Sequence, residues 1–262
     1  MLVLIRGAGD LASGIALRLF HAGLSVVMTE IARPTTIRRT VAFSQAVAQG
    51  KTQVEDVTAR LCQVEDVAGV LAAGEIPVLV DPEAAAISVL KPRVVVDAIL
   101  AKKNLGTAIT DAPVVIGVGP GFTAGVDCHA VVETMRGHTL GRVIWKGSAL
   151  PNTNIPGLIG GFAGERVLRA PADGIFQPAL EIGALVKAGD AAGYVGEKAM
   201  VCTIDGVLRG ILPPDTPVRK GMKSGDVDPR GCVENCTTAS DKALAIGGGV
   251  LEAILQKTGV LR

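Results

Sequence analysis

The sequence has few aromatic residues, no excess of charge of one sign, and no long apolar run. Only 3% of its 262 residues are aromatic, and 26 Lys and Arg residues stand against 25 Asp and Glu residues. This balance, without a basic run, excludes nucleic acid as a general partner. No stretch reaches the roughly 18 consecutive apolar residues of a membrane helix, and no basic-then-apolar leader is visible. We therefore expect a cytoplasmic protein without a membrane partner.

Cysteine is also scarce, and its distribution argues against a disulfide framework. The five cysteines are odd in number and widely scattered, at Cys62, Cys128, Cys202, Cys232 and Cys236. Such a pattern favours reduced thiols. By contrast, 48% of the residues are hydrophobic and 33 are glycine, which is typical of the Val, Ile, Leu and Ala core of an α/β sheet.

The first thirty residues form the most informative pattern. An apolar run, Leu2–Ile5, leads into the glycine-containing stretch Arg6–Gly14, and a second apolar run, Ser25–Thr29, is closed by Glu30. A strand, a glycine turn, a helix, a strand and a terminal acid form the layout of a dinucleotide-binding βαβ unit. Asp10 disagrees with this interpretation, because it places a carboxylate where a pyrophosphate is expected.

Each part of this pattern predicts a contact with a nucleotide-like ligand. The helix that begins near Asp10 offers free amides to an anion, and Glu30 is placed to accept hydrogen bonds from a ribose. Arg33 could hold a phosphate, although a solvated surface is the alternative. Asp10 could instead complement the helix dipole without a ligand. The predicted cofactor-binding residues are Arg6, Gly7, Gly9, Asp10, Ser13, Gly14, Glu30, Arg33, Gly119 and Gly121.

The chain divides by texture into four parts. Residues 1–125 alternate apolar runs with helical stretches, which predicts a Rossmann-like α/β domain with a parallel sheet. Residues 126–166 favour a β-hairpin connecting region. Residues 167–236 are mainly β in character and resemble a barrel-sandwich hybrid of the biotinyl and lipoyl type. Residues 237–262 favour a C-terminal helix.

The β-rich part contains an internal repeat. Asp173-Gly174 recurs as Asp205-Gly206, and Gly189 recurs as Gly221, each 32 positions later. A repeat of this kind predicts two interlocked halves related by a pseudo-twofold axis. In the last helix, Gly247-Gly248-Gly249 predicts either close backbone packing or a break, because each glycine costs a helix about 1 kcal/mol relative to Ala.

A second group of candidate residues lies on one predicted strand. With the alternation of a strand, Asp127, His129 and Glu133 share one face. They could bind a metal ion or act as acid and base. The alternative is an exposed polar strand face.

A third candidate is the loop that precedes the last helix, Gly225–Cys236. Cys236 is expected just before the helix, where unpaired amides can lower the pKa of a thiol. The roles of nucleophile, chalcogen acceptor and soft-metal ligand all stay open for Cys236, as does that of an inert thiol. Cys232 and Cys236 are four apart, an uncommon ligand spacing.

Taken together, these stretches resemble the YqeB-type accessory proteins of the selenium-dependent molybdenum hydroxylase system. The resemblance is carried by Ile5–Ala16, Arg38–Ser44, Gly117–Phe122, Val126–Gly137, Gly225–Gly231, Cys236 and Ser240–Ala243. It implies a Rossmann-like part related to the XdhC chaperones of xanthine dehydrogenase. It also implies a role in maturation, with molybdenum cofactor or a selenium species as ligand and a molybdenum hydroxylase as partner. Cys232 lies outside the family pattern, which weakens a two-cysteine mechanism.

We therefore expect a maturation protein whose ligand lies near Arg6, the Gly7–Gly14 loop and the Gly117–Gly121 turn. Cys236 would hold or relay the chalcogen. One alternative is an NAD(P)-dependent oxidoreductase that uses His129 and Glu133 as catalytic residues for proton transfer. Another is a non-catalytic scaffold that docks a partner. Whether any reaction is catalysed stays open, as does a homo-oligomeric state.

Overall fold

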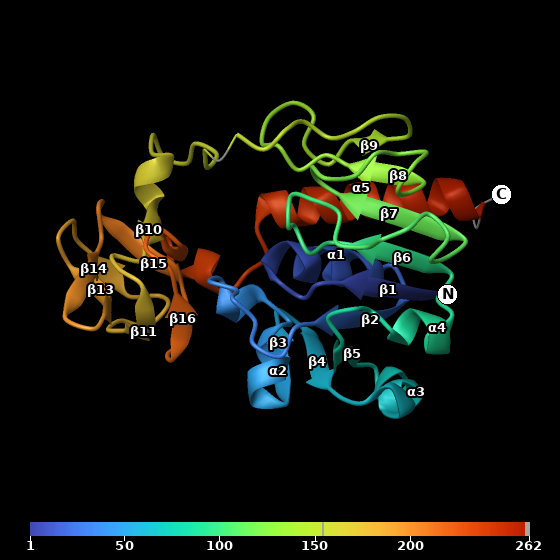
Figure 1. Ribbon diagram of the computed structural model, residues 1–262, viewed down its shortest axis with the longest axis horizontal. Helices are drawn as coiled ribbons and strands as arrows, with labels where there is room; N and C mark the ends of the chain where they lie inside the picture. The colour runs from blue at the N-terminus through green and yellow to red at the C-terminus, as the bar shows by residue number, and fades with distance from the viewer. Residues whose placement is uncertain (154, 260–262) are drawn as a thin grey trace. The chain divides into compact units, whose positions relative to one another are not determined.

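The computed structural model describes residues 1–153 and 155–259, and the chain folds into two compact units (Figure 1). The first unit comprises Met1–Pro34, Ala42–Thr153 and the segment that begins at Ala239. The second comprises Thr35–Val41 and Asn154–Thr238. Neither unit is therefore a single continuous stretch of sequence.

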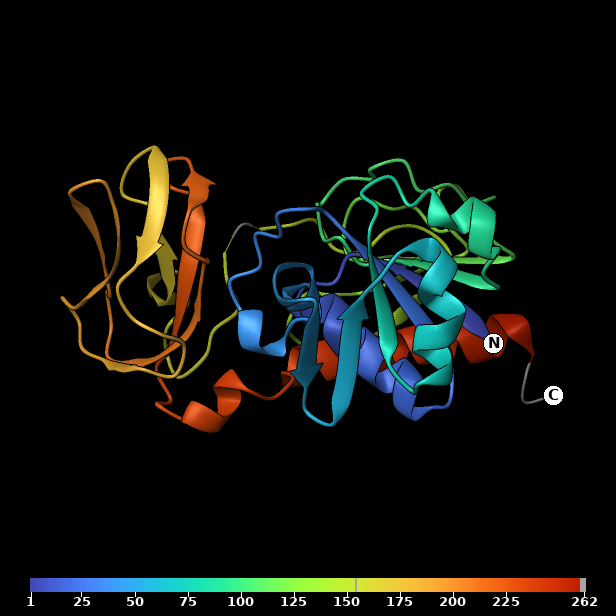
Figure 2. The same ribbon diagram turned by 90° about the horizontal axis from the view of Figure 1, so that it is seen from below.

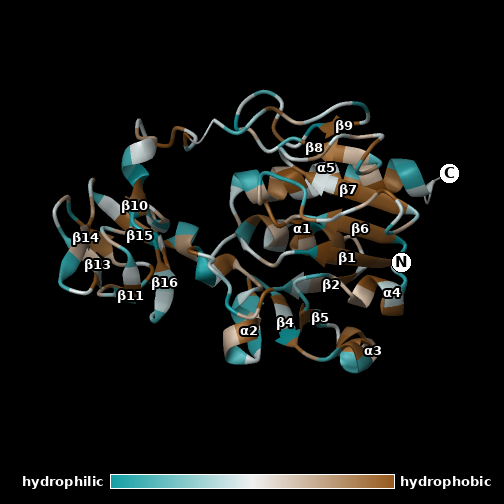
Figure 3. Ribbon diagram, in the orientation of Figure 1, coloured by the Kyte–Doolittle hydropathy of each residue, from teal (hydrophilic) through white to brown (hydrophobic). Residues whose placement is uncertain are grey.

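The first unit is built on a nine-stranded sheet with the order β3-β4-β5-β2-β1-β6-β7-β8-β9. Its central strands are parallel and largely buried, because most of their residues are Val, Ile, Leu and Met (Figure 3). The strands are β1 (Leu2–Arg6), β2 (Ser25–Glu30), β3 (Lys51–Val54), β4 (Val57–Leu61), β5 (Ile76–Val80), β6 (Val94–Asp97), β7 (Val114–Val118), β8 (Ala130–Val132) and β9 (Val143–Ile144).

Helices cover both faces of this sheet. On one face, α1 (Asp10–His21) and α5 (Asp241–Thr258) lie side by side (Figure 2). On the other, α3 (Val67–Ala72) and α4 (Ala86–Leu90) pack over Leu4 and Val27. The short helix α2 (Gln45–Gln49) packs against β3 and β4.

The expected Rossmann-like parallel sheet is wrong. β3 pairs antiparallel with β4, and β8 pairs antiparallel with β9, so the sheet is mixed at both edges. Among the described residues, the connections from β6 to β7 and from β7 to β8 contain no helix. The sequence suggested a parallel sheet because apolar runs mark buried strands but do not specify strand direction. The strand β3, which is short and mostly polar, was not predicted at all.

Helix α5 packs so closely on its neighbours that several glycines have no room for a side chain. A Cβ on Gly14 of α1 would collide with Ala243 of α5. A Cβ on Gly247 would lie 2.8 Å from Cγ of Arg18, and one on Gly249 would collide with the carbonyl oxygen of Gly141. The helix is continuous through the three glycines, so there is no break, and close packing explains Gly247 and Gly249.

The second unit consists of two four-stranded antiparallel sheets, with the orders β10-β17-β15-β12 and β14-β13-β11-β16. Their inner faces share one core, which includes Phe176, Leu208 and Ile211. The strands are β10 (Val167–Arg169), β11 (Gly174–Pro178), β12 (Leu185–Val186), β13 (Ala191–Val195), β14 (Lys198–Val201), β15 (Gly206–Ile211), β16 (Thr216–Val218) and β17 (Lys223–Asp228). The barrel-sandwich hybrid expected here is corrected to this pair of antiparallel sheets.

The 32-residue repeat is visible in the hydrogen bonds of this unit. Asp173 accepts a hydrogen bond from the backbone N–H of Lys220 (2.6 Å), and Asp205 accepts one from the N–H of Ala188 (2.9 Å). Asp205 lies 32 positions after Asp173, and Ala188 lies 32 positions before Lys220. The two hydrogen bonds are therefore equivalent under the repeat, with donor and acceptor in opposite halves. The aspartates therefore join one half of the repeat to the other, which explains why Asp-Gly recurs in the sequence.

The segment Thr35–Val41 belongs to the second unit although it follows β2 of the first. The carbonyl oxygen of Ile37 accepts a hydrogen bond from the N–H of Ile211 (2.8 Å), and Nε of Arg39 donates to the carbonyl of Ile211 (2.9 Å). This segment thus binds the end of β15 at Ile211. Within the described part of the chain, no helix is both long and apolar enough to cross a membrane.

Candidate functional site

The parallel strands of the first unit end at one edge of the sheet. The register pairs Arg6 with Thr29 and with Asp97, and Asp97 with Gly117, so β1, β2, β6 and β7 end in one row. Ligands of open parallel sheets bind outside the carboxyl ends of the strands. This carboxyl edge brings together Arg6, Gly7, Gly9, Asp10, Glu30, Gly119 and Gly121 of the predicted cofactor-binding residues.

The loop after β1 is held by close backbone packing. Gly7 has φ +96°, a conformation that favours glycine, and a Cβ there would lie 3.0 Å from the carbonyl oxygen of Ala98. Gly9 forms the N-cap of α1 with an ordinary φ of −67°. The side chain of Ser13 accepts a hydrogen bond from the N–H of Phe43 and donates to the carbonyl of Ala8. Ser13 therefore braces the loop from within the helix.

Glu30 binds the glycine loop itself. Its carboxylate accepts hydrogen bonds from the N–H of Ala8 (3.0 Å) and from that of Ile31 (2.8 Å). Burial raises the pKa of Glu30, and these two hydrogen bonds oppose the effect in part. The carboxylate predicted for a ribose is thus already engaged in shaping the loop. Gly14 faces α5 and Arg33 is exposed.

Arg6 anchors a polar network that the sequence did not reveal as a unit. Its guanidinium lies 3.6 Å from the carboxylate of Asp97, donates to the hydroxyl of Thr107, and donates to the carbonyl of Leu105 (3.2 Å). Thr107 in turn donates to Asp97 (2.6 Å). Asp97 follows the apolar run of β6, as Glu30 follows that of β2. This shared position at the end of a buried strand is the sequence signal that could have identified Asp97 as part of the site.

Gly119 and Gly121 let neighbouring loops approach the turn after β7. A Cβ on Gly119 would lie 2.8 Å from the hydroxyl of Thr134, and one on Gly121 would lie 2.7 Å from Cα of Lys103. These glycines therefore pack loop against loop, in addition to lying at the carboxyl edge.

The predicted group of Asp127, His129 and Glu133 is not brought together. The strand β8 covers only three residues, so the expected shared face does not extend to Asp127 or Glu133. Asp127 accepts a hydrogen bond from the N–H of Thr123 (2.7 Å), and Nδ1 of His129 accepts one from the N–H of Val115 (2.9 Å). Within the described residues, no three His, Cys, Asp or Glu side chains could hold a metal ion together.

Glu133 is buried and fully engaged by the backbone. One carboxylate oxygen accepts hydrogen bonds from the N–H groups of Thr134 and Met135, both 2.7 Å, and the other accepts one from Leu150 (2.8 Å). These hydrogen bonds stabilise the loops and leave Glu133 poorly placed for proton transfer.

The imidazole of His129 is a weaker base than usual. Burial lowers its pKa, as does the charge of Lys257.

Cys236 belongs to the second unit, where it ends a short 3₁₀ turn, Val233–Cys236. Its side chain is buried, and burial raises its pKa, although the charges of Arg38 and Arg209 oppose that shift. The helix α5 begins only at Asp241, with Ser240 as its cap. The expectation that helix amides activate the Cys236 thiol is therefore wrong.

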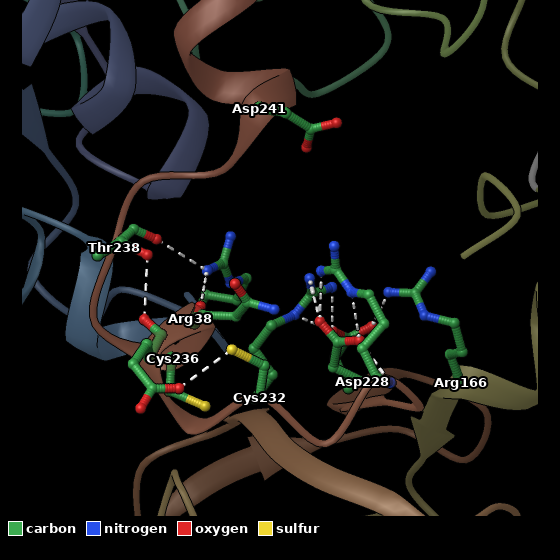
Figure 4. A network of polar contacts seen from close by, with 12 residues as sticks. Arg38, Arg166, Asp228, Cys232, Cys236, Thr238 and Asp241 are labelled. Atoms are coloured by element: carbon green, nitrogen blue, oxygen red, sulfur yellow. Dashed lines mark hydrogen bonds and ion pairs between the residues drawn. The ribbon is translucent and has the colours of Figure 1, made fainter. Parts of the chain in front are cut away.

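Cys232 is the exposed thiol of this loop (Figure 4). Its Sγ donates to the carboxylate of Glu234 (3.1 Å), and this contact lowers the pKa of Glu234. The loop is tied to the segment Thr35–Val41, because Arg38 donates to the carbonyl of Asn235 (2.9 Å) and Thr40 donates to that of Cys236.

Beside this loop, five charged residues form a continuous chain of ion pairs. Arg166 donates to Asp226 (2.9 Å), Arg209 donates to Asp226 (2.5 Å) and to Asp228 (3.1 Å), and Arg230 donates to Asp228 (2.6 Å). All but Arg230 are buried. Burial acts to raise the pKa of Asp228, but the hydrogen bonds and charges of Arg230 and Arg209 outweigh it and hold the pKa at about 2.

The exposure of the two loop thiols predicts a large difference in reactivity. With a thiol-specific reagent such as 5,5′-dithiobis(2-nitrobenzoate), we expect the native protein to show a fast phase that Cys232→Ser removes and Cys236→Ser retains. Cys236 should react on the order of tenfold or more slowly, because it is buried and its thiolate is disfavoured. A fast phase that survives Cys232→Ser but is lost in Cys236→Ser would contradict this assignment.

Comparison with known proteins gives one strong sequence match. No family model matches the chain. Over 255 residues it is 55% identical to the uncharacterized protein YqeB of Escherichia coli K12, and this match covers 97% of the chain but 47% of YqeB. The chain is thus a homologue of YqeB and spans about half the length of that protein.

Two solved structures show distant likenesses to this chain. A succinylglutamate desuccinylase/aspartoacylase of Rhodobacter sphaeroides has a TM-score of 0.22 and 22% identity, over 24% of this chain and 22% of that one. An aspartoacylase family protein of Mesorhizobium loti has a TM-score of 0.27 and 10% identity, over 86% of this chain and 84% of that one. Likenesses at this level support no inference about activity.

Proposed function

Starting from this homology to YqeB, we propose that the chain is an accessory protein in the maturation of a selenium-dependent molybdenum hydroxylase in the cytoplasm. We propose further that it binds the phosphorylated molybdenum cofactor at the carboxyl edge of the nine-stranded sheet. The observation that carries this proposal is the position of α1, whose N-terminus opens directly at that edge behind the Gly7–Gly9 turn.

The residues at this edge suit an anionic group. The first amides of α1 have no acceptor within the helix and lie at the positive end of its dipole. Asp10 adds a negative charge to the same turn, which opposes a pyrophosphate more than a single phosphate ester. Arg6 is 4% exposed, and its Nε has no hydrogen-bond partner among the described residues. A buried N–H without an acceptor fits a ligand oxygen or a water at this position.

The bound cofactor would supply the molybdenum chemistry of the partner enzyme, and this chain would bind and hold it. We assign no chalcogen transfer to Cys236, because its sulfur is buried and its pKa is raised. Nor does the geometry favour an oxidoreductase built on His129 and Glu133, since both side chains accept backbone hydrogen bonds.

The test is the binding of purified molybdopterin to the full chain, measured by quenching of pterin fluorescence. Gly9→Val is expected to weaken binding at least about tenfold, because it puts a branched side chain at the N-cap of α1, next to the amides that the proposal assigns to the anion. The φ of Gly9 is accessible to valine, so the fold should persist. Gly69→Val is the matched control, since it is exposed on α3 and a Cβ there meets nothing within 4 Å.

The outcomes separate the candidate functions. Binding that Gly9→Val weakens and Gly69→Val retains supports the proposal. A wild-type chain that binds no molybdopterin but forms a stable complex with the hydroxylase would instead indicate a docking scaffold.

A further inference from the structure

The connection between β6 and β7 carries backbone strain at its exposed tip. Leu100 has φ +62° and Lys102 has φ +64°, so two residues with side chains adopt the left-handed conformation within three positions. Residues other than glycine, asparagine and aspartate rarely do so. Such strain tends to occur at ligand clamps, where the surrounding structure imposes it.

A buried polar network holds the base of this loop in place. Asp97 accepts hydrogen bonds from the N–H of Ile99 (3.1 Å) and from Thr107, and Arg6 donates to the carbonyl of Leu105. Asn104 and Thr107 exchange two hydrogen bonds of 2.8 Å. The tip is therefore presented by a fixed frame and is not a free surface loop.

The same loop lies against both glycine turns of the carboxyl edge. A Cβ on Gly7 would lie 3.0 Å from the carbonyl oxygen of Ala98. A Cβ on Gly121 would lie 2.7 Å from the backbone of Lys103. Residues 98–107 thus border the turn that precedes α1.

The tip is also basic. Lys102 and Lys103 are exposed, and within the described part of the chain neither forms an ion pair. No acidic residue occurs between Ala98 and Thr110. Arg6, which donates to the carbonyl of Leu105 in the same loop, has an Nε that lacks a hydrogen-bond partner among the described residues. A strained, anchored loop that carries two adjacent lysines and borders the turn before α1 suits a phosphate group.

We propose that residues 98–107 form a phosphate-recognition loop, in which Lys102 and Lys103 bind the phosphate ester of the ligand held at the carboxyl edge. This inference rests on the proposed function and specifies which residues recognise the ligand. The hydrogen bonds at the base of the loop hold its backbone in place before the ligand arrives. Recognition then requires little reorganisation of the loop.

The experiment compares two double charge reversals in the full chain. Lys102→Glu/Lys103→Glu changes the tip. Lys91→Glu/Arg93→Glu makes the same change in charge at two exposed residues just before β6, at the opposite edge of the sheet. Lys91 is also left-handed, with φ +45°, so the control matches the tip in conformation as well.

Two probes are measured, molybdopterin by fluorescence and inorganic phosphate by broadening of its ³¹P resonance. We expect the tip variant to lose about hundredfold in molybdopterin affinity and to abolish the broadening, because two charge-assisted contacts are replaced by repulsion. The control variant should bind molybdopterin with an affinity within about twofold of the wild type. The affinity of the tip variant alone should depend less steeply on salt concentration.

The outcomes distinguish this inference from the proposed function. If the wild type binds molybdopterin and the tip variant binds it equally well, the recognition loop is wrong and the cofactor site stands. If the wild type binds neither probe, both are overturned.

A neutral variant tests the strain itself. Leu100→Gly keeps both lysines but removes the steric restriction that holds the tip in the left-handed conformation, so we expect severalfold weaker binding, because the loop must then be ordered when the ligand binds. Unchanged binding in Leu100→Gly would show that the conformation of the tip does not contribute to recognition.

Discussion

Asp226→Ala is expected to lower the free energy of unfolding of the second unit by about 3–5 kcal/mol. Asp226 is 3% exposed and accepts hydrogen bonds from both Arg166 and Arg209, which are themselves buried. Removing the carboxylate leaves two buried guanidinium charges without the partner they share. The loss should exceed that of an average core truncation of the same size, because desolvation of the charges is no longer compensated.

Urea denaturation followed by circular dichroism measures this effect, and Lys187→Ala provides the comparison. Asp205 pairs with Lys187 at the surface of the same unit, and both side chains are largely exposed. That variant should lose about 1 kcal/mol or less. Equal losses in the two variants would show that the buried ion pairs contribute no more than a surface pair.

Gly249→Ala is expected to destabilise the first unit by about 1–3 kcal/mol or more, although alanine favours helices. The added Cβ would collide with the carbonyl oxygen of Gly141 and would lie 2.9 Å from Val132. The backbone at Gly141 and the side chain of Val132 must then move, and overpacking of this kind carries that cost. Thermal unfolding should report it as a lower melting temperature.

The neighbouring glycine offers a matched control with the opposite sign. Gly248 lies in the same helix, is exposed, and a Cβ there meets nothing within 4 Å. Gly248→Ala should therefore stabilise the protein by about 1 kcal/mol, the difference in helix propensity between the two residues. If both variants destabilise alike, helix packing around Gly141 is not the cause.

The local features of the carboxyl edge could be predicted because they depend on neighbouring residues. The glycine turn, the start of α1 and the acid that closes β2 follow from spacing within thirty positions. The role of Glu30 could not be predicted in the same way. Whether its carboxylate faces a ribose or the N–H of Ala8 depends on how the turn folds back on β2.

Features that depend on distant contacts escaped the sequence pattern. The network of Arg6, Asp97 and Thr107 joins residues about a hundred positions apart. Cys236 lies five positions before the start of α5, yet it ends a 3₁₀ turn of its own, and its thiol is buried near the carbonyl of Leu208. Sequence proximity to a helix therefore did not place the sulfur at the helix end. The antiparallel pairing of β3 with β4, and that of β9 with β8, likewise depends on strand direction, which the periodicity of the sequence does not encode.

The chain passes between its two units four times, after Pro34, Val41, Thr153 and Thr238. No single truncation can therefore yield either unit intact. A fragment that starts after Thr153 would lack Ile37 and Arg38, and with them the partners of Ile211 and Asn235. Separating the second unit for study requires Thr35–Val41 to be joined to the later segment through a linker, or supplied as a peptide in trans. During synthesis, the second unit cannot complete its hydrogen bonds from its later residues alone, so it depends on a segment made more than a hundred residues earlier.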